Sequence, residues 1–400
     1  MWKSREILGQ IERMERYSNL RGKALLFLFF LWFLWFSTFV IRIVFAPILP
    51  LVEDEFMINH AQASSIFIFL STGYSAAVIV AGFFSGRFGY KKSIVLSLGV
   101  LGLVALLVPL VRSFYLLYLF AFVIGFSVGF YLPSAIPLIT EYYSEKTWGR
   151  AITIHDSGAP SAIFATPFVA LFLLHFFPWR GIFIVLACIY LVCSLVFCFV
   201  SSEVKVSSPP KTVFSDLVKI KSLWLMAVIW VFGAGANLGI YSIIPLYLTK
   251  ELQLDIGYAN TILGFSRLGA VGMAIACGFF MGRFNLRKIM FTVMIITGAL
   301  TVLMGLVSVR YIGIVLFLQA FFVTAFFPAG LVAIAKTFSR EMRSLATGII
   351  LAVSIGSGGG IIPYLLGVSG DTISFRLGIT ILGILTALSS RLVFNLKELE

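Results

Sequence analysis

The chain is 400 residues long, and hydrophobic residues make up 60% of it while charged residues make up only 12%. A soluble domain of this size needs far more charged surface, so this composition excludes a water-soluble globular protein. The formal net charge of +13 could still indicate a nucleic-acid partner. The positions of the basic residues decide whether this charge indicates a nucleic-acid partner or the topology of a membrane protein.

Apolar runs long enough to cross a bilayer, about 20 residues each, recur along the chain. Lipid offers no hydrogen-bond partners, so such runs form helices or closed barrels, and continuous rather than alternating apolar runs exclude a barrel. The first run is too long for the apolar core of a signal peptide, and we interpret it as a retained helix. The hydropathy breaks predict an all-α polytopic membrane protein with twelve transmembrane helices, at 24–49, 62–85, 93–111, 114–140, 150–175, 181–202, 222–249, 259–281, 289–308, 312–335, 344–368 and 376–396.

The basic residues follow one topology. With the N-terminus inside, 23 of the 30 lysines and arginines fall in cytoplasmic segments, five fall in outer loops and two fall within the membrane. So strong a positive-inside bias predicts an inner-membrane protein whose N- and C-termini are both cytoplasmic. It also accounts for the basic charge without a nucleic-acid partner.

The predicted helices fall into two halves, 24–202 and 222–400, each with six helices. Residues 203–221 are polar, contain Pro209 and Pro210, and predict a cytoplasmic linker. Residues 1–23 predict either a basic amphipathic helix on the cytoplasmic leaflet or a solvated tail.

The two halves are related by an internal repeat. GFFSGRFGYKK at 82–92 and GFFMGRFNLRK at 278–288 are identical at seven of eleven positions and lie 196 residues apart. FYLPSA at 130–135 and AFFPAG at 325–330 match at an offset of 195. Two separate matches at nearly the same offset indicate a duplication with pseudo-symmetric halves.

The repeated loop resembles the signature loop of the major facilitator superfamily, Gly-x-x-x-Asp-Arg-x-Gly-x-Lys-Lys. EYYSEKTWGRA at 141–151 is also similar to that family's loop between helices 4 and 5. The resemblance covers essentially the whole chain, but Gly86 and Gly282 replace the acid that normally helps to latch the inner gate. The resemblance implies gate loops formed by Gly82, Arg87, Gly89, Lys91, Lys92, Gly278, Arg283, Arg287 and Lys288.

Two arginines fall inside predicted helices, where a charge is costly and usually faces a cavity. Arg42 lies about 12 Å below the outer end of helix 1, and Arg267 lies about 13 Å below the same face in helix 8. No acid is near that level in the sequence. Because arginine suits carboxylate and phosphate recognition, the pair predicts an anion site. Alternatively, each arginine extends outward to headgroups or water.

The repeat offset pairs Asn237 of helix 7 with Arg42, and Ser71 of helix 2 with Arg267. Several embedded polar side chains could add hydroxyl or amide contacts to a substrate, or could serve only in packing. The candidates for substrate contact beside the two arginines are Asn237, Tyr241, Tyr131, Gln319 and Tyr364.

Asp156 lies about 9 Å from the inner end of helix 5, beside His155. A carboxylate at this depth could carry a coupling proton with help from the histidine. It could instead pair with an inner-loop cation as a gate, or hydrogen bond with Ser157 near the irregular backbone at Gly158 and Pro160. These three roles are left open by the sequence.

Helix 1 with its exit, and the stretch from helix 4 to helix 5, are similar to the anion:cation symporter group of the superfamily. That resemblance implies an organic acid or phosphate ester as substrate. The acids typical of that group in helices 1 and 4 are replaced here by Ile41 and Val128. A coupling site would therefore have moved, for example to Asp156, or the protein would be an exchanger or uniporter.

These features predict a monomeric secondary transporter for a small organic anion of carboxylate type, with membrane lipids as its other partners. The alternatives are an exporter of amphipathic or hydrophobic compounds, favoured by 41 phenylalanines, and a membrane signalling or scaffold protein. No nucleophile–base constellation or nucleotide loop suggests an enzyme. The four cysteines lie in predicted helices without metal-ligand spacing, so neither a metal nor a cofactor is expected.

Overall fold

The computed structural model describes residues 17–202, 214–270, 272–273, 276, 285–339 and 342–399. Within these ranges the chain is helical, apart from turns and an isolated bridge between Tyr17 and Tyr143. Eleven of the described segments are long and apolar enough to cross a membrane. The predicted helix at 259–281 runs into undescribed residues. The prediction of an all-α polytopic membrane protein is confirmed.

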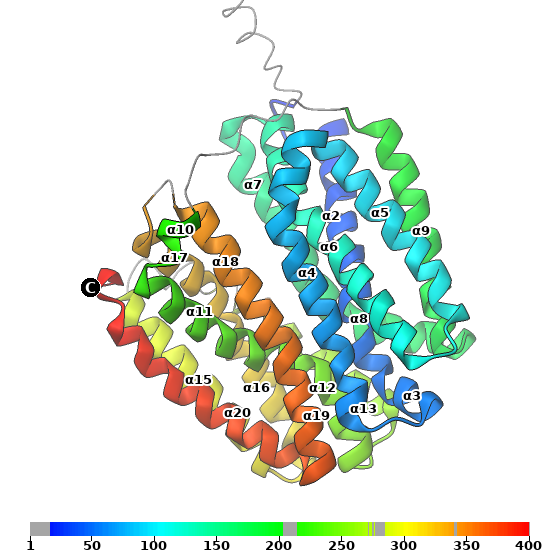
Figure 1. Cartoon of the computed structure of the whole chain (residues 1–400), viewed down its shortest axis with the longest axis vertical. Helices are drawn as coiled ribbons and strands as arrows, with labels where there is room; N and C mark the ends of the chain where they lie inside the picture. The colour runs from blue at the N-terminus through cyan, green and yellow to red at the C-terminus, as the bar shows by residue number, and fades with distance from the viewer. Residues whose placement is uncertain are drawn as a thin grey trace, which may run out of the picture.

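Helices at the start of the chain form one group, here called the N-terminal helices (Figure 1). They are α2 (Lys23–Ile43), α3 (Phe45–Phe56), α4 (His60–Phe88), α5 (Tyr90–Leu107), η1 (Val108–Leu110), α6 (Phe114–Tyr142), α7 (Glu145–Asp156), α8 (Gly158–Phe176) and α9 (Trp179–Val200).

The remaining elements form a second group, the C-terminal helices, preceded by the short α10 (Phe214–Leu217) in the predicted linker. They are α11 (Lys221–Ala234), η2 (Gly235–Gly239), α12 (Ile240–Leu246), η3 (Tyr247–Glu251), α13 (Ile256–Ser266), α15 (Leu286–Leu306), η4 (Val309–Tyr311), α16 (Ile312–Thr324), α17 (Phe326–Thr337), α18 (Arg343–Gly356), η5 (Ser357–Ile361), α19 (Ile362–Thr372), α20 (Phe375–Ser389), η6 (Ser390–Asn395) and η7 (Lys397–Leu399).

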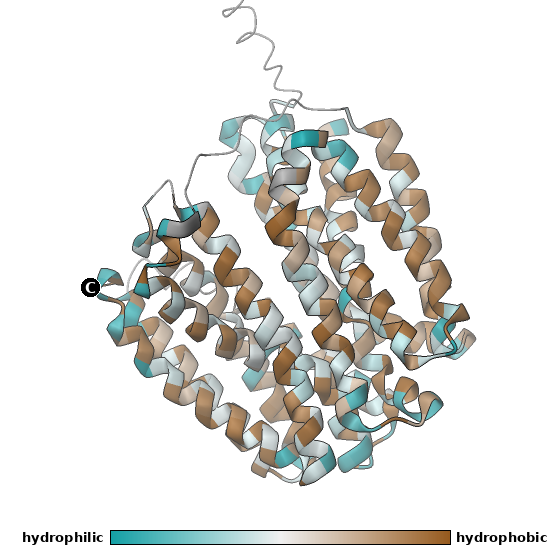
Figure 2. Cartoon of the chain, viewed as in Figure 1, coloured by the Kyte–Doolittle hydropathy of each residue, from teal (hydrophilic) through white to brown (hydrophobic). Residues whose placement is uncertain are grey.

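Hydropathy explains where these helices begin and end. Apolar residues run along their lengths, and hydrophilic residues gather at their ends (Figure 2). The first span is longer than predicted, because the chain turns slightly at Val44 and then continues through Pro47 and Pro50 to Phe56. It ends at Met57, whose φ of 51° is left-handed.

Several of the spans in the structure are interrupted near their middles. The span 145–176 breaks at Ser157, between α7 and α8, and 309–337 turns at Ala325, between α16 and α17. The π-helical turns η2 and η5 interrupt two others. Interruptions of this kind are tolerated inside a membrane only where protein or a polar cavity satisfies the backbone.

The two groups of helices meet at the end that carries the connections around residues 57–59, 252–255 and 373–374. We call this the closed end (Figure 1). One hydrophobic core runs through the N-terminal helices and continues there into α12, α13 and α19. A separate core, which includes Trp230 and Phe326, belongs to the C-terminal helices alone. Among the described residues, the polar contacts between the groups lie at the closed end or near mid-helix.

Candidate substrate-binding site

Arg42 lies in the last turn of α2, directly before the turn at Val44. Its side chain is buried, and its guanidinium carbon lies 4.1 Å from the centre of the Tyr74 ring and 5.2 Å from that of Phe39. Stacking on aromatic faces and the negative pole of a helix C-terminus both favour a cation. These contacts hold the guanidinium without neutralising it.

Arg267 is the C-terminal cap of α13, and only 2% of its surface is exposed. Its Nη1 donates a hydrogen bond of 2.7 Å to Oδ1 of Asn237 in η2. Its guanidinium carbon lies 5.1 Å from the centre of the Tyr241 ring. The structure therefore brings together three of the predicted substrate contacts: Arg267, Asn237 and Tyr241.

The hydrogen bond to Asn237 occupies one corner of the Arg267 guanidinium. Its Nε and Nη2 are buried and have no hydrogen-bond partner among the described residues. The Tyr241 hydroxyl is also buried and has no such partner there. Nε–H and the neighbouring Nη2–H point from one edge of the planar group, in the geometry that matches two oxygens of a carboxylate or phosphate. This edge of Arg267 can bind an anion bidentately.

Neither arginine forms an ion pair with an acid in the part of the chain that the structure describes. The ion pairs there involve His60, Arg180, Lys219, Lys250 and Arg376. A buried cation without a counter-charge is costly in a membrane protein and marks a functional site by default. Arg42 and Arg267 are both buried cations of this kind in the part of the chain that the structure describes.

Close backbone packing connects the surroundings of the two arginines. Ser71, one turn from Tyr74 in α4, lies against η5, where a Cβ on Gly360 would be 3.0 Å from the Cβ of Ser71. On the other side of η5, a Cβ on Gly358 would be 2.8 Å from the nitrogen of Gly235, the first residue of η2. Glycine in η5 thus lets α4 and η2 approach the same helical turn, and η2 carries Asn237.

Three further residues are predicted to contact the substrate: Tyr131, Gln319 and Tyr364. The Tyr131 hydroxyl donates to the carbonyl of Leu31 at 2.8 Å in the interior of the N-terminal helices. Gln319 is fully buried and donates to the carbonyl of Ala236 at 2.7 Å, which supports η2 beside Asn237. Tyr364 is half-buried in α19. The contacts of Tyr131 and Gln319 fit the packing role that the sequence left open.

His155 and Asp156 end α7 at the break in its span. The His155 ring is buried, its centre 6.0 Å from that of Trp35 and 5.8 Å from that of Tyr131. Because the single Tyr131 proton goes to the carbonyl of Leu31, His155 Nε2 must donate in its 3.2 Å contact with that hydroxyl. Asp156 is exposed and close enough to Tyr74 to act on it electrostatically.

The first of the two predicted gate loops forms a tight corner between α4 and α5. Gly89 adopts a φ of 92°, and its N–H donates to the carbonyl of Ser85 at 2.8 Å. Gly82 and Arg87 lie in α4, and Lys91 and Lys92 lie in the first turn of α5. In the second loop, Arg287 and Lys288 begin α15 behind the cap Asn285. Gly278 and Arg283 lie outside the described residues.

Residues that do not stand out in the sequence connect the two groups of helices. Lys250 pairs with Glu53 at 3.6 Å and with Asp54. The Asp371 carboxylate accepts from the backbone N–H groups of His60, at 2.9 Å, and Ala61, at 2.8 Å. Asn260, in α13, donates to the carbonyl of Pro47 at 3.1 Å. Each contact spans more than 190 residues, so local sequence patterns carry no signal for it.

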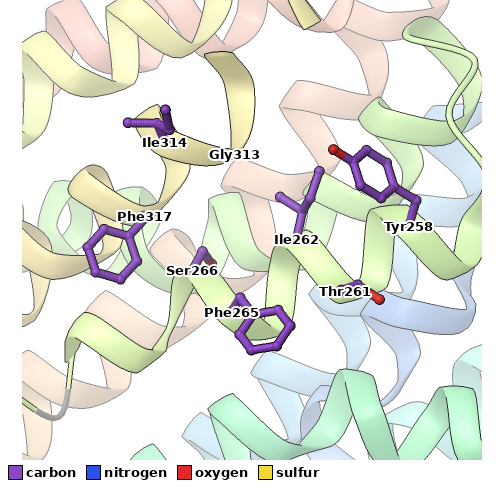
Figure 3. Close-up of a pocket in the computed structure, with 8 residues that line it drawn as sticks. All are labelled: Tyr258, Thr261, Ile262, Phe265, Ser266, Gly313, Ile314 and Phe317. Atoms are coloured by element: carbon purple, nitrogen blue, oxygen red, sulfur yellow. The ribbon is translucent and has the colours of Figure 1, made fainter. Parts of the chain in front are cut away.

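A separate hollow of about 390 Å³ lies between α13 and α16 (Figure 3). Its lining includes Phe265 and Ile314, which are 52% and 62% exposed, and carries no charged side chain. Exposed apolar side chains on membrane-spanning helices face lipid chains. This hollow is therefore distinct from the buried arginine site, although Ser266 beside Arg267 borders it.

Comparisons with known proteins place the fold. A profile described as Major Facilitator Superfamily matches residues 31–310 and 239–398. A bacterial homologue of the human lysosomal transporter Spinster, solved in an inward-facing and occupied conformation, superimposes with a TM-score of 0.77 at 16% identity, covering 95% of this chain and 97% of the other. A D-xylose-proton symporter gives a TM-score of 0.75 at 14% identity, covering 92% and 96%.

Three curated relatives match parts of the chain. They are "Uncharacterized transporter YybO" of Bacillus subtilis (25% identical, covering 39% of this chain and 36% of that protein), "Probable sulfoacetate transporter SauU" of Cupriavidus necator (28%, covering 38% and 35%) and "Protein TsgA homolog" of Buchnera aphidicola (25%, covering 56% and 58%). The matches thus span between about a third and three-fifths of these relatives. The profile match, the spanning helices and the fold agree, and the chain belongs to the major facilitator superfamily.

Proposed function

We propose that this protein is a secondary transporter that moves a small organic anion of carboxylate type across the inner membrane. The observation that carries the proposal is the buried edge of Arg267, where Nε and Nη2 have no partner among the described residues. A carboxylate would satisfy both donors at once. Arg42, stacked on Tyr74 without an acid of its own, supplies the second positive charge.

The proposed mechanism is alternating access. We place both termini in the cytoplasm, as the positive-inside bias favours, so that the closed end faces outward. The contacts of Lys250, Asn260 and Asp371 with the N-terminal helices then close the outer side. On this assignment the structure represents a state that is open inward, and the site lies between the groups of helices near mid-membrane.

The relatives are compatible with an anionic substrate. One of them carries the name of a sulfoacetate transporter, and sulfoacetate is an organic anion. That match covers 38% of this chain, so the substrate class proposed here rests mainly on the two arginines.

Asp156 is the proposed coupling residue. It is an exposed carboxylate at a helix break, within electrostatic range of Tyr74, which stacks on Arg42. Protonation of Asp156 would change the field at the anion site, and this links a proton to the substrate. His155, buried beside it, orders the α7 end of the break through its contact with Tyr131. We propose that the monomer is the transporting unit.

Uptake by proteoliposomes tests the proposal. Arg42→Ala and Arg267→Ala should each abolish the uptake of the carboxylates that the wild-type protein transports. Thr261→Val is the matched control, because its hydroxyl bonds only within α13, to the Gly257 carbonyl at 2.7 Å. Uptake that survives in both arginine variants contradicts the anion site. Efflux of a hydrophobic dye by both variants would instead support the exporter alternative.

A further inference from the structure

Asn260 lies on α13 two turns before Arg267 and is fully buried. Its side chain contacts the carbonyl of Pro47 at 3.1 Å, 213 residues away in the N-terminal helices. A carbonyl only accepts hydrogen bonds, so the amide nitrogen must face Pro47. The amide oxygen is then left buried, without a partner among the described residues.

One face of α13 carries both Asn260 and Arg267, because residues seven apart lie on the same side of a helix. Gly264, between them, lies on that face as well, and a Cβ there would overlap the ring of Phe168 in α8. The face that carries the arginine is thus the face that packs against the N-terminal helices.

The same contact fixes the levels of the two arginines. Arg42 lies five residues from Pro47, about 8 Å along the helix, and Arg267 lies seven residues from Asn260, about 10 Å along α13. Both distances run from the Asn260–Pro47 contact away from the closed end. The backbones of Arg42 and Arg267 therefore lie at nearly equal distances from the one hydrogen bond that joins their spans.

We propose that Asn260 is a positioning residue that sets the spacing between Arg42 and Arg267, and thereby selects anions by the distance between their two acidic groups. This inference rests on the proposed anion transport. It assigns the substrate a second acidic group, because each guanidinium would bind one. The hydrogen bond to Pro47 acts as the spacer, since α3, which carries Pro47, continues the span that carries Arg42.

The test uses the full-length protein in lipid nanodiscs and the dicarboxylate series malonate, succinate, glutarate and adipate, with acetate as the monoanion. Binding is measured as thermal stabilisation, which reports the dissociation constant of each anion. Asn260→Leu keeps the side-chain size but removes the donor, and Asn260→Gln keeps the donor but moves it outward by a methylene. Thr261→Val, on the neighbouring residue, is the matched control.

The wild-type protein should prefer one member of the series. Asn260→Leu should reduce the ratio of dissociation constants between the weakest-bound and the tightest-bound dicarboxylate about tenfold. This is the effect of losing one buried hydrogen bond. Asn260→Gln should shift the preferred length, and Thr261→Val should change neither. Should Asn260→Leu misfold, the length preference of Asn260→Gln decides the question.

Two results would overturn the inference and leave anion transport standing: acetate binding as tightly as every dicarboxylate, or both Asn260 variants keeping the wild-type order of preference with uniformly weaker binding. The second result would make Asn260 a structural residue only. If no anion stabilises the wild-type protein and none is taken up, the proposed function fails, and this inference fails with it.

Discussion

Asp371 caps a helix of the opposite group, and replacing it with asparagine should loosen the closed end. Its carboxylate accepts from the first two N–H groups of α4, at 2.9 Å and 2.8 Å. The residue also lies in the last turn of its own helix, α19, where a negative charge is unfavourable. The positive pole of α4 compensates for this only while the two groups of helices are together.

The size of the effect follows from these contacts. Two hydrogen bonds to a charged acceptor contribute about 3 to 6 kcal/mol when buried. Asp371 is exposed, however, and asparagine keeps one acceptor oxygen, so the expected loss is about 1 to 2 kcal/mol. A change of this size shifts the equilibrium between closed and open forms about 5- to 30-fold toward opening at this end.

Distances between spin labels measure this shift. Labels at Met57 and Tyr311, which are 91% and 51% exposed at the closed end, report the separation of the two groups once the four native cysteines are replaced. Asp371→Asn should enlarge the population with the longer distance. The matched control is Asp255→Asn, because Asp255 caps its own helix, α13, by accepting from Tyr258 N–H at 3.1 Å. An unchanged distance distribution in Asp371→Asn, or an equal shift in the control, would refute the role of Asp371 as a cap on the opposite group of helices.

Three further changes test separate parts of the structure. Arg267→Lys keeps the charge but loses the two-donor edge, so substrate affinity should fall about 10- to 100-fold. Uptake at varied substrate concentration measures this affinity, and an unchanged value would rule out bidentate binding. Asp156→Asn should abolish accumulation driven by a proton gradient while exchange of substrate for substrate continues; loss of both would favour the gate role. Tyr143→Phe removes a hydrogen bond of 2.6 Å to the Ala24 carbonyl and should lower the free energy of unfolding by about 1 kcal/mol. Thermal unfolding in detergent measures this loss, and Tyr115→Phe, at a 77% exposed position, should not show it.

The fold could be predicted from the sequence because its main constraint is one-dimensional. A bilayer sets the length of each helix, and the loops between helices carry the topology signal. Gly158 and Pro160 indicated the irregular backbone beside Ser157, but hydropathy could not find the turn at Ala325, since one irregular turn leaves the mean hydropathy of a span unchanged. The same reasoning ended the first span at residue 49, whereas the helix continues through Pro50 to Phe56. Buried residues on both sides of Pro50 hold the helix together there.

The candidate site was only partly predictable. Arg42 and Arg267 stand out in the sequence because a membrane rarely tolerates a charge. Tyr74 and Asn260 do not stand out, since an embedded tyrosine or asparagine is common in packing. Their contacts with Arg42 and Pro47 depend on which helices meet, and that is a property of the tertiary structure alone.

The asymmetry of the site explains how substrate could act on the closed end. In the repeat, Asn237 occupies the position equivalent to Arg42, at an offset of 195 residues. The first helix of the N-terminal group thus supplies a cation, while in the C-terminal group the cation lies on the second helix, in α13, and the first supplies the amide that holds it. Placing Arg267 on α13 puts it on the helix whose face contacts Pro47 and Phe168 of the other group. An anion bound by both arginines would draw together the two helices that already form this contact, so binding energy would favour closure at that end.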